Sequence, residues 1–155
     1  MPYGGFVMKR GSSVVLVVAF AIAASCGGST PTTTGTTGAT ATNAVVATGT
    51  TVFLAGQTGM RADGAIVSGG VVAQFEQALA NLLDALGAAG GSPTDLTSLT
   101  IYIVDMDDYR AHGREIGEVW KRLVGSDYPA MAGIGVSRLW DEDAVVEVQG
   151  FAVLP

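Results

Sequence analysis

The sequence has very few of the residues that commonly build reactive or metal centres. Among its 155 residues there is one cysteine, Cys26, and one histidine, His112. A single cysteine excludes an intramolecular disulfide and any metal cluster made of cysteines. No Ser-His-Asp set can be assembled without His112. The neighbouring Arg110 and Arg114 indicate a solvent-exposed histidine, in preference to a general base.

Charge is also scarce, and it is unevenly divided. Only 14% of the residues are charged, and eight Lys and Arg against fourteen Asp and Glu give a net charge of −6. An acidic surface repels phosphate backbones, and the chain has no basic patch interleaved with aromatic residues. We therefore expect no nucleic-acid partner.

Patterns for a phosphate, metal or cofactor site are missing too. The glycines within Gly87–Gly91 follow a predicted helix, whereas a phosphate-binding loop precedes one. Asp105, Asp107 and Asp108 lack the spacing and the terminal glutamate of a calcium loop. Asp107 is instead expected to cap a helix. We predict no metal site and no cofactor.

The N-terminus has the outline of a signal peptide over residues 1–25. Lys9 and Arg10 precede the apolar run Val14–Ala24, which is shorter than the roughly 20 residues of a membrane-spanning helix. Small residues then lead to Cys26, as in a bacterial lipoprotein signal whose cysteine is acylated. We expect a protein exported to the cell envelope or periplasm and attached to the membrane only through this lipid. Ordinary secretion, or a later start site on a cytoplasmic protein, are the alternatives.

Residues 26–43 are rich in Thr and Gly and carry no charge, a composition typical of a flexible linker. The folded domain is expected to cover residues 44–155. Apolar residues three and four positions apart predict helices, and β-branched runs predict strands. The expected order is β-β-α-β-α-β-β, with strands at 45–47, 51–55, 99–104, 132–139 and 144–153 and helices at 71–89 and 109–123.

This order predicts an α+β domain in which both helices pack on one face of a mixed sheet. The helices are long enough to connect parallel strands, and the last two strands should form a hairpin. The other face still carries apolar residues, in Ile101–Val104 and Val145–Val153. Because no segment of the domain is left to cover that face, we expect an oligomer.

Four segments of the domain carry a family pattern. They are Phe53–Gly59, Ile101–Asp108, Tyr128–Leu139 and Val145–Gln149. Through them the chain resembles, from about Val45 to Pro155, the Rid family of reactive-intermediate (enamine/imine) deaminases, also called the YjgF or RidA-like family. The resemblance implies a chorismate-mutase-like fold, a homotrimer whose three sheets enclose a barrel, and a small-molecule site in the cleft between subunits.

Glu147 is the best candidate for a catalytic residue. It lies between Val146 and Val148 in an apolar strand, where an ionised carboxylate without a partner costs several kcal/mol. The resemblance implies that the matching glutamate orients the attacking water. The alternative is a structural glutamate paired with a neighbouring chain.

Other positions depart from the pattern of the active deaminases. Met131 stands where the family has an arginine that clamps the substrate carboxylate, and a thioether cannot form that bidentate pair. Gly133, Gly113 and Ala55 stand where the family has a cysteine, an asparagine and a serine, while Gly56 is kept. These residues are expected to line a substrate pocket that is roomier and less polar.

Arg138 is not expected to replace the missing clamp, because strand alternation puts it on the opposite face from Met131. The resemblance therefore implies a RidA-like hydrolase that converts enamine or imine C=N bonds to a carbonyl product and ammonia, with a larger or uncharged substrate. The alternative is a non-catalytic module of the same fold that binds a small ligand or a partner.

Overall fold

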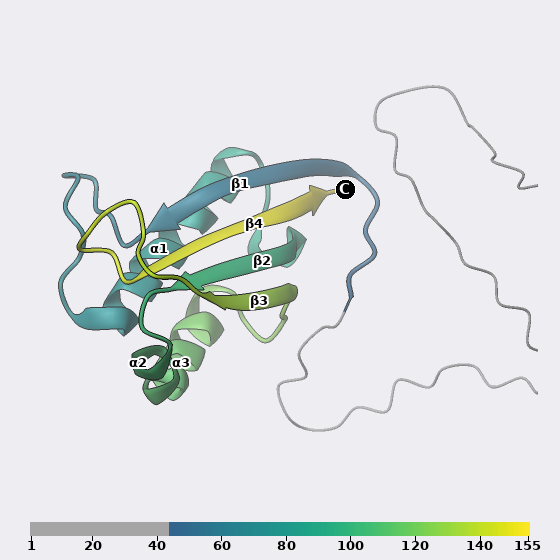
Figure 1. The fold of residues 1–155 in the computed structure, drawn as a ribbon. Coiled ribbons are helices and arrows are strands. Elements are labelled where there is room, and N and C mark those ends of the chain that lie inside the picture. The colour runs from purple at the N-terminus through teal and green to yellow at the C-terminus, as the bar shows by residue number, and fades with distance from the viewer. Residues whose placement is uncertain (1–43) are drawn as a thin grey trace, which may run out of the picture. The chain divides into compact units, whose positions relative to one another are not determined.

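The computed structural model describes residues 44–155. The predicted signal peptide (1–25), the linker (26–43) and Cys26 lie outside these residues. The described elements, drawn in Figure 1, are β1 (Thr50–Thr58), α1 (Gly70–Ala88), the short helical turn η1 (Pro93–Asp95), β2 (Leu96–Ile103), α2 (Met106–Ala111), α3 (Gly113–Leu123), β3 (Ala130–Gly135) and β4 (Val146–Leu154). Each helix among residues 44–155 is too short or too polar to span a bilayer.

The four strands form one mixed sheet in the order β1-β4-β2-β3. The central strand β4 pairs antiparallel with both β1 and β2, and β2 pairs parallel with the edge strand β3. The parallel step is possible because α2 and α3 carry the chain back to the starting end of β2. The α+β class and the mixed sheet predicted from the sequence are confirmed.

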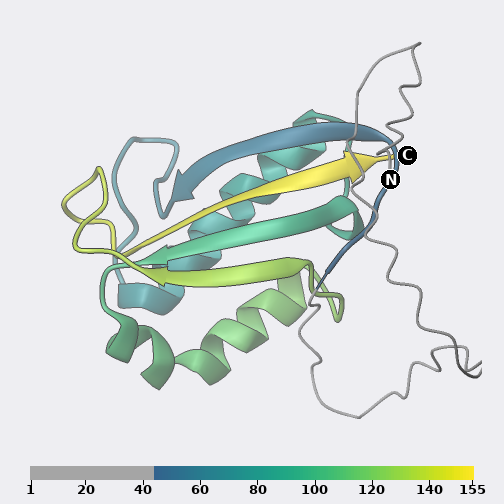
Figure 2. The same ribbon diagram turned by 45° about the vertical axis from the view of Figure 1, so that its right-hand side comes forward.

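The helices pack on one face of the sheet and leave the other face uncovered (Figures 1 and 2). Strand alternation decides which side chains enter the core between sheet and helices. Val146 and Val148 of β4 are fully buried beneath the helices, and Glu147 between them points to the uncovered face. The largest fully buried side chains are Trp120, Phe75, Leu79, Leu82, Leu86, Leu99, Ile103, Val146 and Val148.

The two helical segments supply the core in different ways. In α1, the apolar stripe that predicted the helix is fully buried at Leu79, Leu82 and Leu86. In α3, Trp120 is buried, stacks on Tyr128 with the ring centroids 5.3 Å apart, and donates its indole N–H to a backbone carbonyl at 3.2 Å. Trp120 therefore fills the core with its polar N–H satisfied.

The strand predicted at 45–47 is wrong. Among residues 44–155 the first strand begins at Thr50, and Val46 is almost fully exposed. Within the described residues β1 pairs with β4 alone, so no hairpin precedes β1. The short β-branched run has strand propensity, but propensity produces a strand only where a neighbouring strand offers hydrogen bonds and packing.

The single helix predicted over 109–123 is in fact two helices, α2 and α3, which meet at His112. A glycine, Gly113, opens α3, and glycine is a poor residue for continuing a helix. The predicted cap is also wrong. Asp105 caps α2, because its Oδ1 accepts hydrogen bonds from the backbone N–H groups of Asp107 at 3.0 Å and Asp108 at 2.9 Å.

The predicted terminal hairpin is wrong as well. β3 ends at Gly135, not at Leu139, and β2 lies between β3 and β4. The turn residues between the two strands suggested a hairpin. However, alternate side chains of β4 are buried under the helices, and such a strand is most stable with a neighbouring strand on each side. β3 is largely exposed and lies at the edge of the sheet.

The packing of α1 can be tested with two adjacent leucines. Leu82→Ala should lower the free energy of unfolding by about 2–5 kcal/mol, because it leaves a cavity between α1 and the sheet. Leu83→Ala, the same change at a partly buried position, should cost clearly less. Urea denaturation of both variants measures the difference, and equal losses would contradict the orientation of α1.

Candidate active site

Glu147 lies near the start of β4 on the uncovered face of the sheet. Its Cα pairs with Tyr102 of β2 on one side and with Thr58 of β1 on the other. The residue is partly buried, and its carboxylate is in none of the ion pairs found among residues 44–155. A carboxylate in this state can accept a proton from a bound water.

The Glu147 carboxylate lies directly over the backbone of Gly56. A Cβ at Gly56 would overlap Oε1 of Glu147, so only glycine at this position lets the carboxylate stay where it is. The pairing of β1 and β4 shifts between Leu54 and Gln57, as in a β-bulge, and Gly56 lies in that shift. The Gln57 amide donates to the carbonyl oxygens of Gly56 at 3.0 Å and Ala55 at 3.3 Å. Local hydrogen bonds therefore brace the backbone under the carboxylate.

Tyr102 is a residue of this site that the sequence analysis missed. It is the direct cross-strand neighbour of Glu147, so both side chains lie on the uncovered face. Its phenol can donate or accept a hydrogen bond. The sequence feature that could have identified Tyr102 is its place between Ile101 and Ile103. Because these two side chains are buried, Tyr102 must point away from the helices.

Met131 and Gly133 lie on the other side of the sheet from Glu147. Met131 pairs with Leu99 and Gly133 with Ile101, both of them core residues. A Cβ at Gly133 would lie 3.5 Å from Cδ1 of the buried Ile103, so a side chain at this position would also point toward the core. A single chain therefore cannot apply Glu147 and Met131 to one small substrate.

The remaining predicted residues divide in the same way. Ala55 is exposed on β1 beside Gly56, and so belongs with Glu147. Gly113 is the first residue of α3 in the helix layer, with no atom within 4 Å of the position of a Cβ. The structure thus brings together Glu147, Gly56 and Ala55, and it leaves Met131, Gly133 and Gly113 apart from them.

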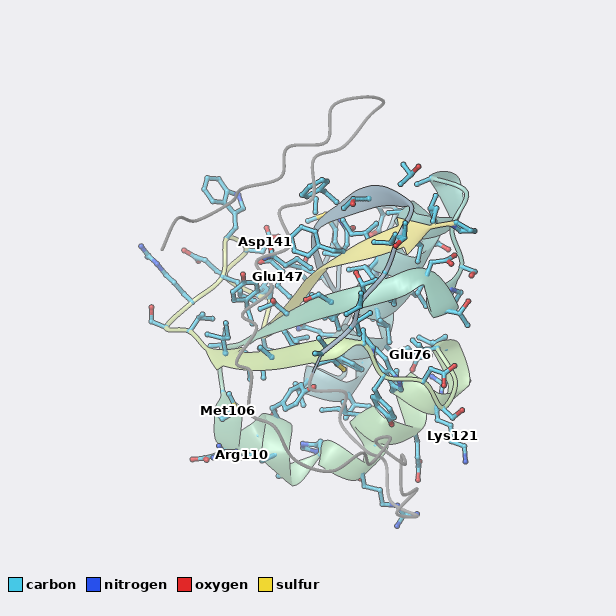
Figure 3. The ribbon with its side chains drawn as sticks, turned by 90° about the vertical axis from the view of Figure 1, so that its right-hand side faces the viewer. Glu76, Met106, Arg110, Lys121, Asp141 and Glu147 are labelled. Atoms are coloured by element: carbon cyan, nitrogen blue, oxygen red, sulfur yellow. The ribbon has the colours of Figure 1, made fainter. Side chains whose placement is uncertain are left out.

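Cations are scarce near Glu147. Arg61 pairs with Asp63 at 3.1 Å, Arg114 with Glu118 at 3.1 Å, and Arg122 with Glu76 at 2.6 Å. Figure 3 shows Arg110 and Lys121 on the helices, well away from Glu147.

Arg138 lies in the exposed loop between β3 and β4, beyond the end of β3 at Gly135. The alternation used to orient Arg138 therefore does not apply to it. The same loop carries the acidic residues Asp141, Glu142 and Asp143, so its overall charge is negative.

His112 lies at the junction of α2 and α3 and is not part of this cluster. Its Nδ1 lies 2.9 Å from the Asp108 carbonyl oxygen and 3.2 Å from Asp108 Oδ1. That carbonyl, followed by the carboxylates of Asp108 and Glu115, raises the pKa of His112 above its ordinary value. With 43% of its side chain exposed, His112 has the solvent-exposed position predicted from the sequence.

Comparison with known proteins gives consistent matches. The family model Endoribonuclease L-PSP matches residues 36–154. The chain is similar to the 2-iminobutanoate/2-iminopropanoate deaminase of Capra hircus, with 36% identity over 104 residues, which cover 66% of this chain and 72% of that protein. The human protein of the same name is 32% identical over the same shares of both chains.

Solved structures agree with these matches. The chain is similar to the Rid-family protein YyfB from Yersinia pestis, with a TM-score of 0.62 and 33% identity over 68% of this chain and 80% of that one. It is also similar to E. coli TdcF with bound serine, with a TM-score of 0.60 and 30% identity over 71% of this chain and 85% of that one.

The contact between Glu147 and Gly56 can be tested with alanine. Gly56→Ala should displace the carboxylate yet change the free energy of unfolding by less than about 1 kcal/mol, because the flexible end of a side chain can move. Gly150→Ala is the contrast: its Cβ would meet the Ser98 carbonyl oxygen at 2.5 Å, and backbone cannot move aside cheaply. It should cost about 1–3 kcal/mol. Urea denaturation and a crystal structure of Gly56→Ala check both expectations, and an unmoved carboxylate would contradict the geometry.

Proposed function

The chain belongs to the Endoribonuclease L-PSP family, which includes the Rid or YjgF proteins, and on that premise we propose that it hydrolyses enamine or imine C=N bonds to a carbonyl product and ammonia. The observation that carries the proposal is the Glu147 carboxylate, which lies over Gly56 and is in none of the ion pairs among the described residues. Relatives named as imine deaminases support it at 32% and 36% identity.

In this reaction Glu147 accepts a proton from water while the water oxygen attacks the imine carbon. The C=N double bond becomes a single bond and the nitrogen takes the proton from Glu147, which gives a tetrahedral carbinolamine. The hydroxyl proton of the carbinolamine then passes through Glu147 to the nitrogen, the C–N bond breaks, ammonia leaves, and the oxygen becomes the carbonyl oxygen. Backbone N–H groups near Gly56, or near Gly133 of a neighbouring copy, hold the substrate. One water is consumed, and no oxidant or reductant is needed.

The complete site is proposed to form between copies of the chain, in a homotrimer. Glu147 and Met131 occupy opposite sides of the sheet, so only a second copy can bring a Met131 to a given Glu147. The uncovered face offers a surface for that copy, because Phe53 is 76% exposed and Phe151 is 40% exposed, and their rings pack edge to face at 5.2 Å. Apolar side chains of this size are usually covered in an assembly.

The substrate is proposed to be a larger or uncharged imine. The relatives' names describe 2-imino acids, which carry a carboxylate. Met131 cannot pair with a carboxylate, and the other described cations are in ion pairs, on the helices, or in the acidic loop that holds Arg138. An uncharged imine would enter such a site without leaving a buried carboxylate unpaired.

A second candidate function is binding of a small ligand without catalysis. Met131 favours it, since the site lacks the cation that would orient a substrate carboxylate. The similar structure of E. coli TdcF with bound serine supports a ligand site in this fold.

The hydrolase proposal is tested by single-turnover hydrolysis of imines generated in situ from charged and uncharged amines. Imines without a carboxylate should be hydrolysed by the purified protein, and Glu147→Gln should slow them about 100-fold or more, since the amide cannot accept the proton. Glu142→Gln, the same change in the loop before β4, is the matched control and should keep full activity. Brisk turnover of a small 2-imino acid would contradict the proposed substrate. Ligand-induced stabilisation without turnover of any imine would favour the binding module.

The inter-subunit site is tested by mixing two inactive variants. Glu147→Gln and Met131→Asp should each lose activity, and co-expression should restore part of it. Some interfaces then combine an intact Glu147 from one copy with an intact Met131 from another. If the site lay within one chain, the mixture would stay as inactive as either variant. Sedimentation velocity of the wild-type protein checks the trimer directly.

A further inference from the structure

The helix α1 contains one buried polar side chain, Gln74, which the sequence analysis did not consider. Gln74 is 6% exposed, and among residues 44–155 it is the one polar residue that is buried. Its Nε2 donates to the Asp143 carbonyl oxygen at 2.9 Å, and its Oε1 accepts from the Val145 backbone N–H at 2.8 Å. Both bonds hold the segment that enters β4, two residues before Glu147.

Asn81, further along α1, holds the neighbouring strand. Its Nδ2 donates to the carbonyl oxygens of Thr58 at 3.1 Å and Met60 at 2.8 Å. Gln77 fixes the orientation of this amide by donating to its Oδ1 at 2.8 Å. Thr58 is the last residue of β1, and its Cα pairs with that of Glu147. Asn81 therefore holds the end of β1 just beyond Gly56.

These amides are not needed to bury apolar area. The rest of the buried stripe of α1 is largely aliphatic, and a Leu or Met at position 74 would fill similar space. A buried amide stabilises only when both of its polar ends are bonded. Both ends of Gln74 bond to the backbone of one segment, whereas Asn81 bonds to backbone through Nδ2 and accepts from the Gln77 side chain at Oδ1. The chain passes closely here, because a Cβ at Gly59 would lie 2.9 Å from the Gln74 Cα. What the amides add to the packing is therefore directional hydrogen bonding, which fixes the position of the start of β4 and of the end of β1.

We propose that Gln74 and Asn81 are positioning residues, which hold the ends of β4 and β1 so that the Glu147 carboxylate stays over the Gly56 peptide. The inference rests on the proposed function for its catalytic consequence, but the position of Glu147 is a separate physical quantity. A displacement of about 1 Å in a reacting group can cost on the order of 100-fold in rate. Two backbone bonds on each side of the site restrict that displacement.

The test compares Gln74→Met and Asn81→Leu, which remove the amides, with Gln74→Glu, which keeps an acceptor for the Val145 N–H. Leu86→Ala is the control for general destabilisation. It removes core packing at the other end of α1, where Leu86 lies with Leu154 around Gly91. In each full-length protein the carboxyl resonance of isotope-labelled Glu147, assigned by its loss in Glu147→Gln, reports the position of the side chain at fixed pH. Gly56→Ala shows the shift produced by displacing it.

We expect the Glu147 resonance to move in Gln74→Met and Asn81→Leu, to move less in Gln74→Glu, and to stay in place in Leu86→Ala. On an imine substrate, kcat should fall about 10- to 100-fold in the first two variants, with KM little changed. An unmoved resonance in Gln74→Met, or an equal movement in Leu86→Ala, would overturn the proposal. If Gln74→Met does not fold, the Gln74→Glu variant decides: a Glu147 resonance identical to that of the wild type would overturn the proposal. Absence of hydrolysis in the wild-type protein would refute the proposed function, while the resonances would still decide the positioning.

Discussion

The structure depends on the register of one strand, β4, in a sheet that helices cover on one face only. Val146 and Val148 are fully buried under the helices, and this burial fixes the central strand in place. The side-chain period of a strand is two, so the same register sends Glu147 to the uncovered face. A slip by one residue would expose both valines and bury the carboxylate. The register of β4 therefore sets both the burial of the core and the placement of the candidate catalytic group.

The uncovered face links this site to assembly. A carboxylate on an open sheet face is well solvated, which weakens its electrostatic effect on a substrate. If a second copy covers the face around Phe53 and Phe151, the same contact excludes water from Glu147 and brings in the edge strand β3 of a neighbour. In such an arrangement the chemistry and the oligomer interface cannot change independently. Under the proposed assembly, this coupling would let a chain with few charges keep a partly buried glutamate on β4.

The side of α1 that faces the sheet carries both aliphatic side chains and hydrogen-bonding amides. Its aliphatic residues, such as Leu79 and Leu82, supply non-directional burial and would tolerate some sliding against the sheet. The amides of Gln74 and Asn81 supply directional hydrogen bonds to specific carbonyl and N–H groups, and so they define where β1 ends and where β4 begins. Packing holds the layers together, whereas the amides define the ends of the strands that meet at Glu147 and Gly56.

The sequence by itself determined the α+β class and the apolar stripe of α1, and it singled out Glu147 as a candidate, because periodicity and an isolated charge are local properties of the chain. It also indicated that one sheet face would lack a cover. Only the tertiary structure decided that residues 45–47 find no strand partner, that β2 separates β3 from β4, and that Met131 and Glu147 lie on opposite sides of the sheet. It also brought Gln74 to Asp143 and Val145, a contact between segments far apart in the sequence. The physical reason is the same in each case: strand pairing and buried hydrogen bonds are made with distant residues, and a local pattern does not specify which distant residue is the partner.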